Sequence, residues 1–189
     1  YAAGVPEGTV REYYESGKLM SETQMSGGKK TGLCRRYYES GKLQCESTFR
    51  DDRLQGIQKT YYESGRLQNE ISYKGNVING PVKAYYPSGI LQETADYADG
   101  HREGISRQYY ASGLLQSQCG YKNGKRQGLC KSFYPGGKLM REETYAADLL
   151  NGPCREYYAS GNLQAEDNYR DNVLQDAGRL YYESGKLMS

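Results

Sequence analysis

Few side chains in this sequence have the types and spacing that catalysis requires. His101 is the only histidine and stands beside Arg102 in a spacer between two hairpin motifs. A triad or metal site needs such a histidine beside a positioned acid, nucleophile or second ligand. The sequence offers His101 no such partner, so we interpret it as a solvated loop residue.

The glutamates of the turns recur at one position of a repeating motif. They are Glu15, Glu39, Glu63 and Glu183. On neighbouring hairpins of a sheet they would be about 10 Å apart, which forms a charged rim and not a general acid with its base. Gly27-Gly28 precedes no helical pattern and does not fit a phosphate loop. We therefore expect no catalytic residues, no metal, no cofactor and no enzyme activity.

The spacing of the cysteines favours mostly free, packed side chains over disulfide-bonded or metal-binding ones. Cys34, Cys130 and Cys154 share one column of the repeat, whose neighbours would lie about 10 Å apart, beyond the roughly 7 Å limit between Cα atoms of a disulfide. Only Cys119 and Cys130, on either side of one spacer, are placed to meet, and the sequence leaves open whether they are bonded. A mostly unpaired set predicts a reducing compartment and so a cytoplasmic protein. The alternative is export after removal of a signal peptide.

These residues are spaced by a motif that recurs every 24 residues without insertion or deletion. Its first copy is Tyr13-Tyr14-Glu15-Ser16-Gly17-Lys18-Leu19, and a strict period of this length indicates a repeat array. The glycines predicted to form its structural turns are Gly17, Gly41, Gly65, Gly89, Gly113, Gly137, Gly161 and Gly185. A further Gly precedes the aromatic pair in the first seven copies, and a large side chain follows it, beginning with Gly8 and Met25.

Each repeat reads as one β-hairpin, because a Ser-Gly dipeptide between aromatic or β-branched runs suggests a two-residue turn. With Ser16-Gly17 as the loop, the predicted cross-strand pairs are Tyr14 with Leu19, Tyr13 with Met20, Arg11 with Glu22, and Gly8 with Met25. Extended over all repeats, this register sets a base opposite an acid in five of seven hairpins. Opposite charges across a strand pair support the register.

The alternation of strand side chains predicts two unlike faces. One carries the Tyr14 and Leu19 columns, and the other carries the Tyr13 column with the Arg/Glu ladder. A hydrophobic fraction of 37% and a mean hydropathy of −0.90 leave little for a second layer to bury. We therefore predict an all-β fold: an elongated, twisted, largely single-layer antiparallel sheet of about eight tandem hairpins, forming one repeat domain over residues 1–189.

The pattern Tyr-Tyr-x-Ser-Gly-x-Leu, followed after about six residues by an aromatic and then a Gly-rich spacer, resembles the bacterial variant of the MORN repeat. The resemblance covers the whole chain, although the Tyr-x-Gly-x-Trp of the ordinary MORN repeat is absent. It implies hairpins stacked into a curved sheet that serves in scaffolding, membrane attachment or protein contacts. Bacterial variants are often labelled antitoxin-like.

The chain ends and the spacers carry further expectations. Tyr1 falls in the large-residue column, so the chain begins in mid-repeat, and it ends at Ser189 within the last hairpin, which suggests a fragment of a longer chain, a processed chain or covered ends. The six-residue spacers, such as 26–31, vary most and are expected to be solvated loops or sites of specificity. Near the end, Asp176-Ala177-Gly178 displaces the expected Gly and predicts a bent or frayed last repeat.

Three hypotheses follow for function. The first is a non-enzymatic scaffold that binds an unknown protein, since exposed aromatic bands usually mark an interaction surface. The second is a structural protein that pairs with itself end to end through open edge strands. The third is a peripheral membrane tether, for which the basic pairs Lys29-Lys30 and Lys125-Arg126 offer only weak contact with anionic lipid. A net charge of +2 argues against nucleic acid as a partner.

The candidate interaction face consists of two columns, with the alternative that they pack only against their neighbours in the sheet. The tyrosines are Tyr14, Tyr38, Tyr62, Tyr86, Tyr110, Tyr134 and Tyr158. The leucines are Leu19, Leu43, Leu67, Leu91, Leu115, Leu139 and Leu163.

Overall fold

The computed structural model describes residues 4–188, and within them the chain forms seventeen strands and no helix. The predicted all-β fold of tandem antiparallel hairpins is therefore confirmed. The chain divides into two compact units, the first running through Leu91 and including Tyr97–Gly100, and the second holding Gln92–Asp96 and continuing from His101. Strand β8 (Leu91–Ala98) contributes to both units. The expectations for Tyr1 and Ser189 lie outside the described residues.

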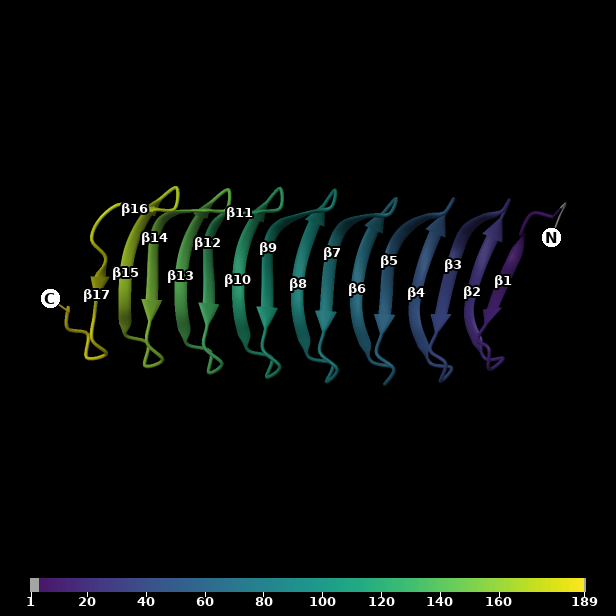
Figure 1. Ribbon diagram of the computed structural model, residues 1–189, viewed down its shortest axis with the longest axis horizontal. Coiled ribbons are helices and arrows are strands. Elements are labelled where there is room, and N and C mark those ends of the chain that lie inside the picture. Colours follow the sequence, from purple (N-terminus) through teal and green to yellow (C-terminus); the bar gives the residue numbers. More distant parts are fainter. Residues whose placement is uncertain (1–3, 189) are drawn as a thin grey trace. The chain divides into compact units, whose positions relative to one another are not determined.

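In the first unit, each strand pairs antiparallel with the next along the chain (Figure 1). Its strands are β1 (Gly8–Tyr13), β2 (Leu19–Ser26), β3 (Lys29–Tyr37), β4 (Leu43–Arg50), β5 (Arg53–Tyr61), β6 (Leu67–Lys74) and β7 (Val77–Tyr85). The Ser-Gly turns lie at the lower edge of this unit in Figure 1, and the spacers lie at the upper edge.

The second unit repeats this meander. Its strands are β9 (His101–Tyr109), β10 (Leu115–Lys122), β11 (Lys125–Arg126), β12 (Gly128–Phe133), β13 (Leu139–Ala146), β14 (Leu149–Tyr157), β15 (Leu163–Arg170), β16 (Val173–Leu174) and β17 (Arg179–Leu180). The last two strands are short and separated by residues 175–178, where the sequence predicted a bend or fraying.

The predicted register holds away from the turns and is wrong beside them. Gly8 pairs with Met25 and Arg11 with Glu22, as expected, but a bulge follows and Tyr13 pairs with Leu19. The loop has three residues and not two: Tyr14 N donates to Lys18 O at 2.8 Å, and Gly17 N donates to Tyr14 O at 2.9 Å. A two-residue type I′ turn needs positive φ at both residues. Ser16 keeps a negative φ, and only Gly17 reaches +78°.

The two-residue turns lie in the spacers, and not at the Ser-Gly dipeptides where the sequence predicted them. Asp51 and Asp52 have φ values of 48° and 63°, and the residues on either side of them, Arg50 and Arg53, pair across the turn. Positive φ at two successive residues is the type I′ geometry, which Gly, Asn and Asp adopt most readily. The strands therefore extend into the spacers, and the expectation of six-residue loops is wrong.

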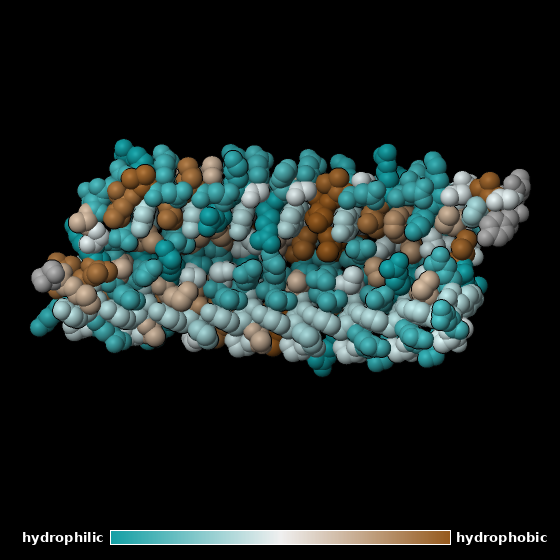
Figure 2. Space-filling view, viewed as in Figure 1, coloured by the Kyte–Doolittle hydropathy of each residue, from teal (hydrophilic) through white to brown (hydrophobic). Residues whose placement is uncertain are grey.

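The structure buries few side chains, as the low hydrophobic fraction predicted. Among the described residues, the apolar side chains that become buried are Ala95, Cys130, Tyr145 and Cys154, and none of them is completely enclosed. On the face of each unit that Figure 2 draws, hydrophobic side chains lie as separate clusters among hydrophilic ones. Each unit is therefore stabilised mainly between neighbouring hairpins, in the manner of repeat proteins.

Candidate interaction surface

The charged face of each unit carries the predicted ladder, which we call the ladder face. The ion pairs that span its hairpins are Arg11–Glu22 at 2.8 Å, Arg35–Glu46 at 2.9 Å, Lys59–Glu70 at 3.7 Å, Lys131–Glu142 at 2.7 Å and Arg155–Glu166 at 2.8 Å. Partly exposed pairs of this kind contribute little to stability individually. They matter more for recognition, because an anion of the same chain already neutralises each of these five cations.

The first aromatic of the repeat lies on this same face. The hydroxyl of Tyr37 donates to Glu22 at 3.2 Å, and Tyr157 donates to Glu142 at the same distance. The hydrogen bond from Arg11 lowers the pKa of Glu22, and the one from Lys131 lowers the pKa of Glu142. Burial, followed by the charge of Glu142, raises the pKa of Tyr157. Base, acid and tyrosine thus form a connected group that spans two adjacent hairpins.

The tyrosines of the predicted Tyr14 column form hydrogen bonds between neighbouring repeats. All seven of its predicted tyrosines are half-buried. The hydroxyl of Tyr14 donates to the main-chain carbonyl of Tyr37 at 2.6 Å, and that of Tyr134 donates to Tyr157 O at 2.7 Å. These hydroxyl groups already have an acceptor within the sheet. A role for this column in binding a partner stays a prediction.

The predicted leucine column pairs with the first aromatic and not with the second. The bulge sets Leu19 opposite Tyr13 and Leu43 opposite Tyr37, and the same pairing recurs in the second unit. Directly opposite residues project to the same side of a strand pair. The half-buried leucines therefore lie on the ladder face, and the expectation that they share a face with the Tyr14 column is wrong.

A second apolar column on the ladder face was missed in the sequence. Ile57 is 52% exposed, Ile105 is 50% exposed and Leu129 is 48% exposed. Each stands two residues before a cation of the ladder, within a stretch of regular pairing, so it projects to the same face as that cation. The 24-residue period of this column could have revealed it in the sequence. The column consists of Leu33, Ile57, Pro81, Ile105, Leu129 and Pro153.

The spacer turns are tied to the preceding repeat and are not free loops. Asn76 N donates to Leu54 O at 3.1 Å, and Leu54 N donates back to the side-chain oxygen of Asn76 at 2.6 Å. Asp52 with Lys30, Asp148 with Arg126, and Asn172 with Leu150 form the same reciprocal pair. Where the corresponding residue is Gly28, Gly100 or Gly124, the main-chain bond alone is made. This contact explains why the variable spacers favour Gly, Asn and Asp.

The cysteines separate into one disulfide and three free thiols. Cys119 and Cys130 are joined, with their Cα atoms 4.1 Å apart across β10 and β12. This settles the pairing that the sequence left open. Cys34, Cys45 and Cys154 are free. Burial raises the pKa of Cys154, which favours the unreactive thiol form.

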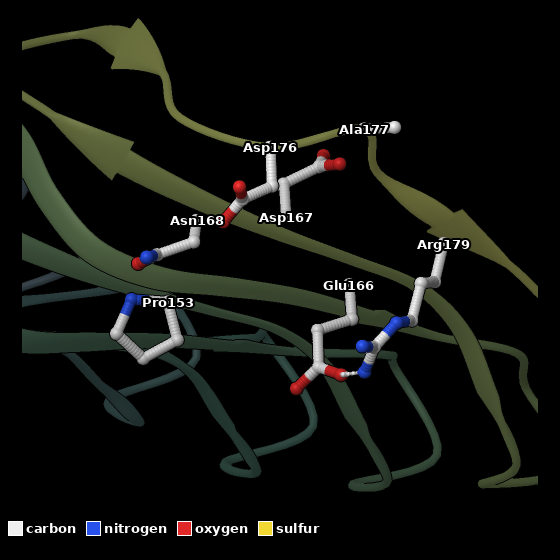
Figure 3. Close-up of a pocket in the computed structure, with 7 residues that line it drawn as sticks. All are labelled: Pro153, Glu166, Asp167, Asn168, Asp176, Ala177 and Arg179. Atoms are coloured by element: carbon white, nitrogen blue, oxygen red, sulfur yellow. Dashed lines mark ion pairs between the residues drawn. The ribbon is translucent and has the colours of Figure 1, made fainter.

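The last repeat of the second unit encloses a hollow of about 710 Å³ (Figure 3). Its lining residues are Pro153, Glu166, Asp167, Asn168, Asp176, Ala177 and Arg179. Arg179 pairs with Glu166 at 3.7 Å, as the dashed line in Figure 3 marks. The hollow forms because residues 175–178 leave the sheet between β16 and β17, so it is a consequence of the irregular spacer.

Residues 4–188 were expected to hold no metal and to contain no stretch that spans a bilayer. In this part of the chain, no three His, Cys, Asp or Glu side chains are grouped closely enough to hold a metal ion. Nor does any helix there have the length and apolar character needed to cross a membrane.

One solved structure resembles the chain weakly. A crystal structure of mutant S. aureus TarM in complex with fondaparinux, α-GlcNAc-glycerol and UDP matches 64% of this chain at 11% identity, with a TM-score of 0.35. The match spans 21% of the length of that chain, and a likeness at this level carries no argument here. Among curated proteins, none matches the chain.

The repeats themselves match a family model in seven successive copies. The model is that of the MORN repeat variant, and the matched residues are 6–26, 30–51, 54–74, 78–99, 102–123, 126–147 and 150–171. Each match spans one hairpin, from its first strand through the Ser-Gly turn to the end of its second strand, so the copies follow the structural period. Because they cover most of the sequence, the chain belongs to the MORN repeat variant family.

Proposed function

We propose that this chain is a non-enzymatic scaffold that binds another protein through its ladder face. Repeats of this family generally mediate contacts with proteins or membranes and are generally not enzymes. The choice of a protein partner goes beyond that general role. The exposed surface of each unit supports this choice.

The observation that carries the proposal is the exposed aliphatic column. Ile57, Ile105 and Leu129 leave about half of their surface in solvent while standing in register beside charged residues. A recurring apolar row with a polar surround is typical of an interaction surface. The ladder beside it is largely self-neutralised, which favours a protein surface over nucleic acid or a strongly anionic membrane as the partner.

The experiment is capture from cell extract on the immobilised chain, comparing the wild type with Ile57→Glu and Leu129→Glu. We expect a protein retained by the wild type to be lost with these variants. Gln108→Glu, which adds the same charge on the opposite face, should retain it. Capture that is equal in all four proteins, or that never exceeds the bare matrix, would contradict the proposal.

Light scattering over a hundredfold range of concentration gives an independent check. A constant mass is expected of a scaffold that awaits a partner. Mass that grows with concentration would favour self-assembly through edge strands instead.

A further inference from the structure

The ladder of the second unit is interrupted at Gln118. This residue pairs with Arg107 of β9 on one side and with Lys131 of β12 on the other. In the next repeat, Glu142 occupies the corresponding position between Lys131 and Arg155. An uncharged amide therefore stands where five of the seven copies place a carboxylate, between cations about 10 Å apart. Thr94, one repeat earlier, is the other exception.

The tyrosine of the same group is also replaced. Tyr157, fifteen residues after Glu142, donates its hydroxyl to that carboxylate. Phe133, at the same offset from Gln118, has no hydroxyl to donate. Both partners of the recurring acid–tyrosine contact are thus absent at this junction, which leaves it more apolar than its neighbours and more cationic than the junction at Glu142.

Exposed aliphatic side chains border the junction on one side. Ile105 and Leu129 lie two residues before Arg107 and Lys131, on the same face and about half exposed. Arg107 itself is half-buried and lies across the strand pair from the amide of Gln118. Residues two apart on a strand lie about 6.8 Å from one another. The same separation holds between alternate side chains of any extended peptide.

The strands that carry this patch are cross-linked from the opposite face. Cys119 follows Gln118 in β10, and Cys130 lies between Leu129 and Lys131 in β12. Because neighbouring residues of a strand point to opposite faces, the disulfide lies behind the patch. It holds β10 and β12 together and reduces the conformational entropy that a bound partner would have to remove.

We infer that Ile105, Arg107, Gln118, Leu129, Lys131 and Phe133 form a docking site for an extended segment of a partner protein. The segment carries an acidic side chain with an apolar residue two positions away. Its carboxylate completes the ladder at Gln118, accepting hydrogen bonds from Arg107 and from the amide of Gln118. Its apolar residue lies over Gly120, between Ile105 and Leu129, and covers both. This inference rests on the proposed scaffold function and assigns it a site.

Charge favours a protein segment over a lipid surface. A basic residue near an anionic membrane contributes about 1 kcal/mol, and stable attachment needs several together. The next cation of the row, Arg155, is paired with Glu166 at 2.8 Å, and Lys131 is shared with Glu142. One local excess of positive charge fits one carboxylate better than it fits a charged plane.

The test is titration of the intact chain with the capped peptide Thr-Leu-Thr-Glu-Thr-Leu-Thr, followed by NMR of the backbone amides. We expect saturable shifts centred on Arg107, Gln118 and Lys131. Gln118→Glu supplies the missing carboxylate and should weaken binding about tenfold or more, equivalent to at least about 1.4 kcal/mol. Gln108→Glu makes the same change on the opposite face of β9 and should leave the affinity unaltered. Thermal melts of both variants verify that they are folded.

A transplanted site tests the same inference by gain of binding. Glu46→Gln should leave Arg35 and Lys59 without their shared acid, beside Leu33 and Ile57, and create a second site in the first unit. The number of peptides bound should rise from one to two. The control peptide with Gln in place of Glu should bind neither protein.

Several outcomes would overturn the inference. They are no saturable shift with the peptide, equal affinity in wild type and Gln118→Glu, and binding of vesicles containing phosphatidylserine that Gln118→Glu abolishes while the peptide does not bind. If a protein is captured from extract equally by wild type and Gln118→Glu, the site assignment fails and the scaffold function stands. If no protein is captured, the scaffold function fails as well.

Discussion

The side-chain hydroxyl of Tyr14 donates a hydrogen bond of 2.6 Å to the main-chain carbonyl of Tyr37, one repeat further along the chain. In the second unit, Tyr110 makes the same bond to Phe133, also at 2.6 Å. The acceptor is a main-chain group, so the bond does not depend on which side chain follows. The second aromatic of the repeat therefore joins one hairpin to the next.

This bond predicts a measurable cost for Tyr134→Phe. The change removes only the hydroxyl that donates to Tyr157 O at 2.7 Å and leaves that part-buried carbonyl without this donor. We expect the free energy of unfolding to fall by about 1 kcal/mol, the usual net contribution of such a bond. Urea melts measure it. Tyr13→Phe, at a site 58% exposed, is the matched control, and equal losses in the two variants would refute the structural role.

Gly113 tests the geometry of the three-residue turn. Its φ is +86°, which lies in the left-handed region of the backbone. Gly113→Ala should cost about 1–2 kcal/mol, because the left-handed region is unfavourable for residues with a Cβ. Gly113→Asn should cost less, since Asn tolerates this region. Should Asn prove as costly as Ala in denaturant melts, the turn assignment would be wrong.

Asn76 tests the contact between a spacer turn and the preceding repeat. Asn76→Ala removes the 2.6 Å bond to Leu54 N and places Ala at a φ of 72°. We expect a loss of about 1–3 kcal/mol from the two effects together. Asn76→Gly keeps the permitted φ and should cost less. Hydrogen exchange at the Leu54 amide should accelerate in both variants, and unchanged exchange would contradict the contact.

Ala147 is a site where a substitution should stabilise the protein. It has a φ of 51°, and the residue 24 positions earlier, Asn123, adopts 50° in the equivalent turn. Ala147→Asn or Ala147→Gly should therefore raise the free energy of unfolding, by about 0.5–1 kcal/mol. Thermal melts measure the change. Ala111→Gly, in a turn residue without positive φ, is the control and should not stabilise the protein.

The ladder predicts acid sensitivity. Hydrogen bonds from Arg11 and Lys131 lower the pKa values of Glu22 and Glu142 in the folded chain. A carboxyl with a lowered pKa contributes stability above its unfolded value of about 4.3 and loses it as the pH falls through the folded value. Stability should thus decline below about pH 4.3. Glu142→Gln should flatten this decline, and an identical pH profile for the variant would exclude the linkage.

Much of the fold could be predicted from the repeat pattern. The pairing of Arg11 with Glu22 and of Gly8 with Met25 could be deduced because the 24-residue period holds in every copy and a base faces an acid in five of seven hairpins. The turn beside Leu19 could not, because one bulged residue reverses which side chains share a face. A one-residue shift has this effect in any strand, since side chains alternate with a period of two.

The ladder face was recognised as charged from the sequence, but its exposed aliphatic column was not. Ile105 and Leu129 are ordinary strand residues by type, and their exposure depends on the absence of a covering layer. The importance of Gln118 likewise required the pairing with both Arg107 and Lys131. A residue's neighbours across a sheet are remote in the chain, so only the register identifies them.

The sequence by itself determined the period, the all-β class and the position of each hairpin, because these depend on local preferences repeated in every copy. The tertiary structure alone decided the turn types, the reciprocal bonds between spacers and preceding repeats, the Cys119–Cys130 bond and the membership of each face. The disulfide and the reciprocal bonds depend on contacts between residues 11 to 22 positions apart, whose geometry is fixed only when neighbouring strands are packed together.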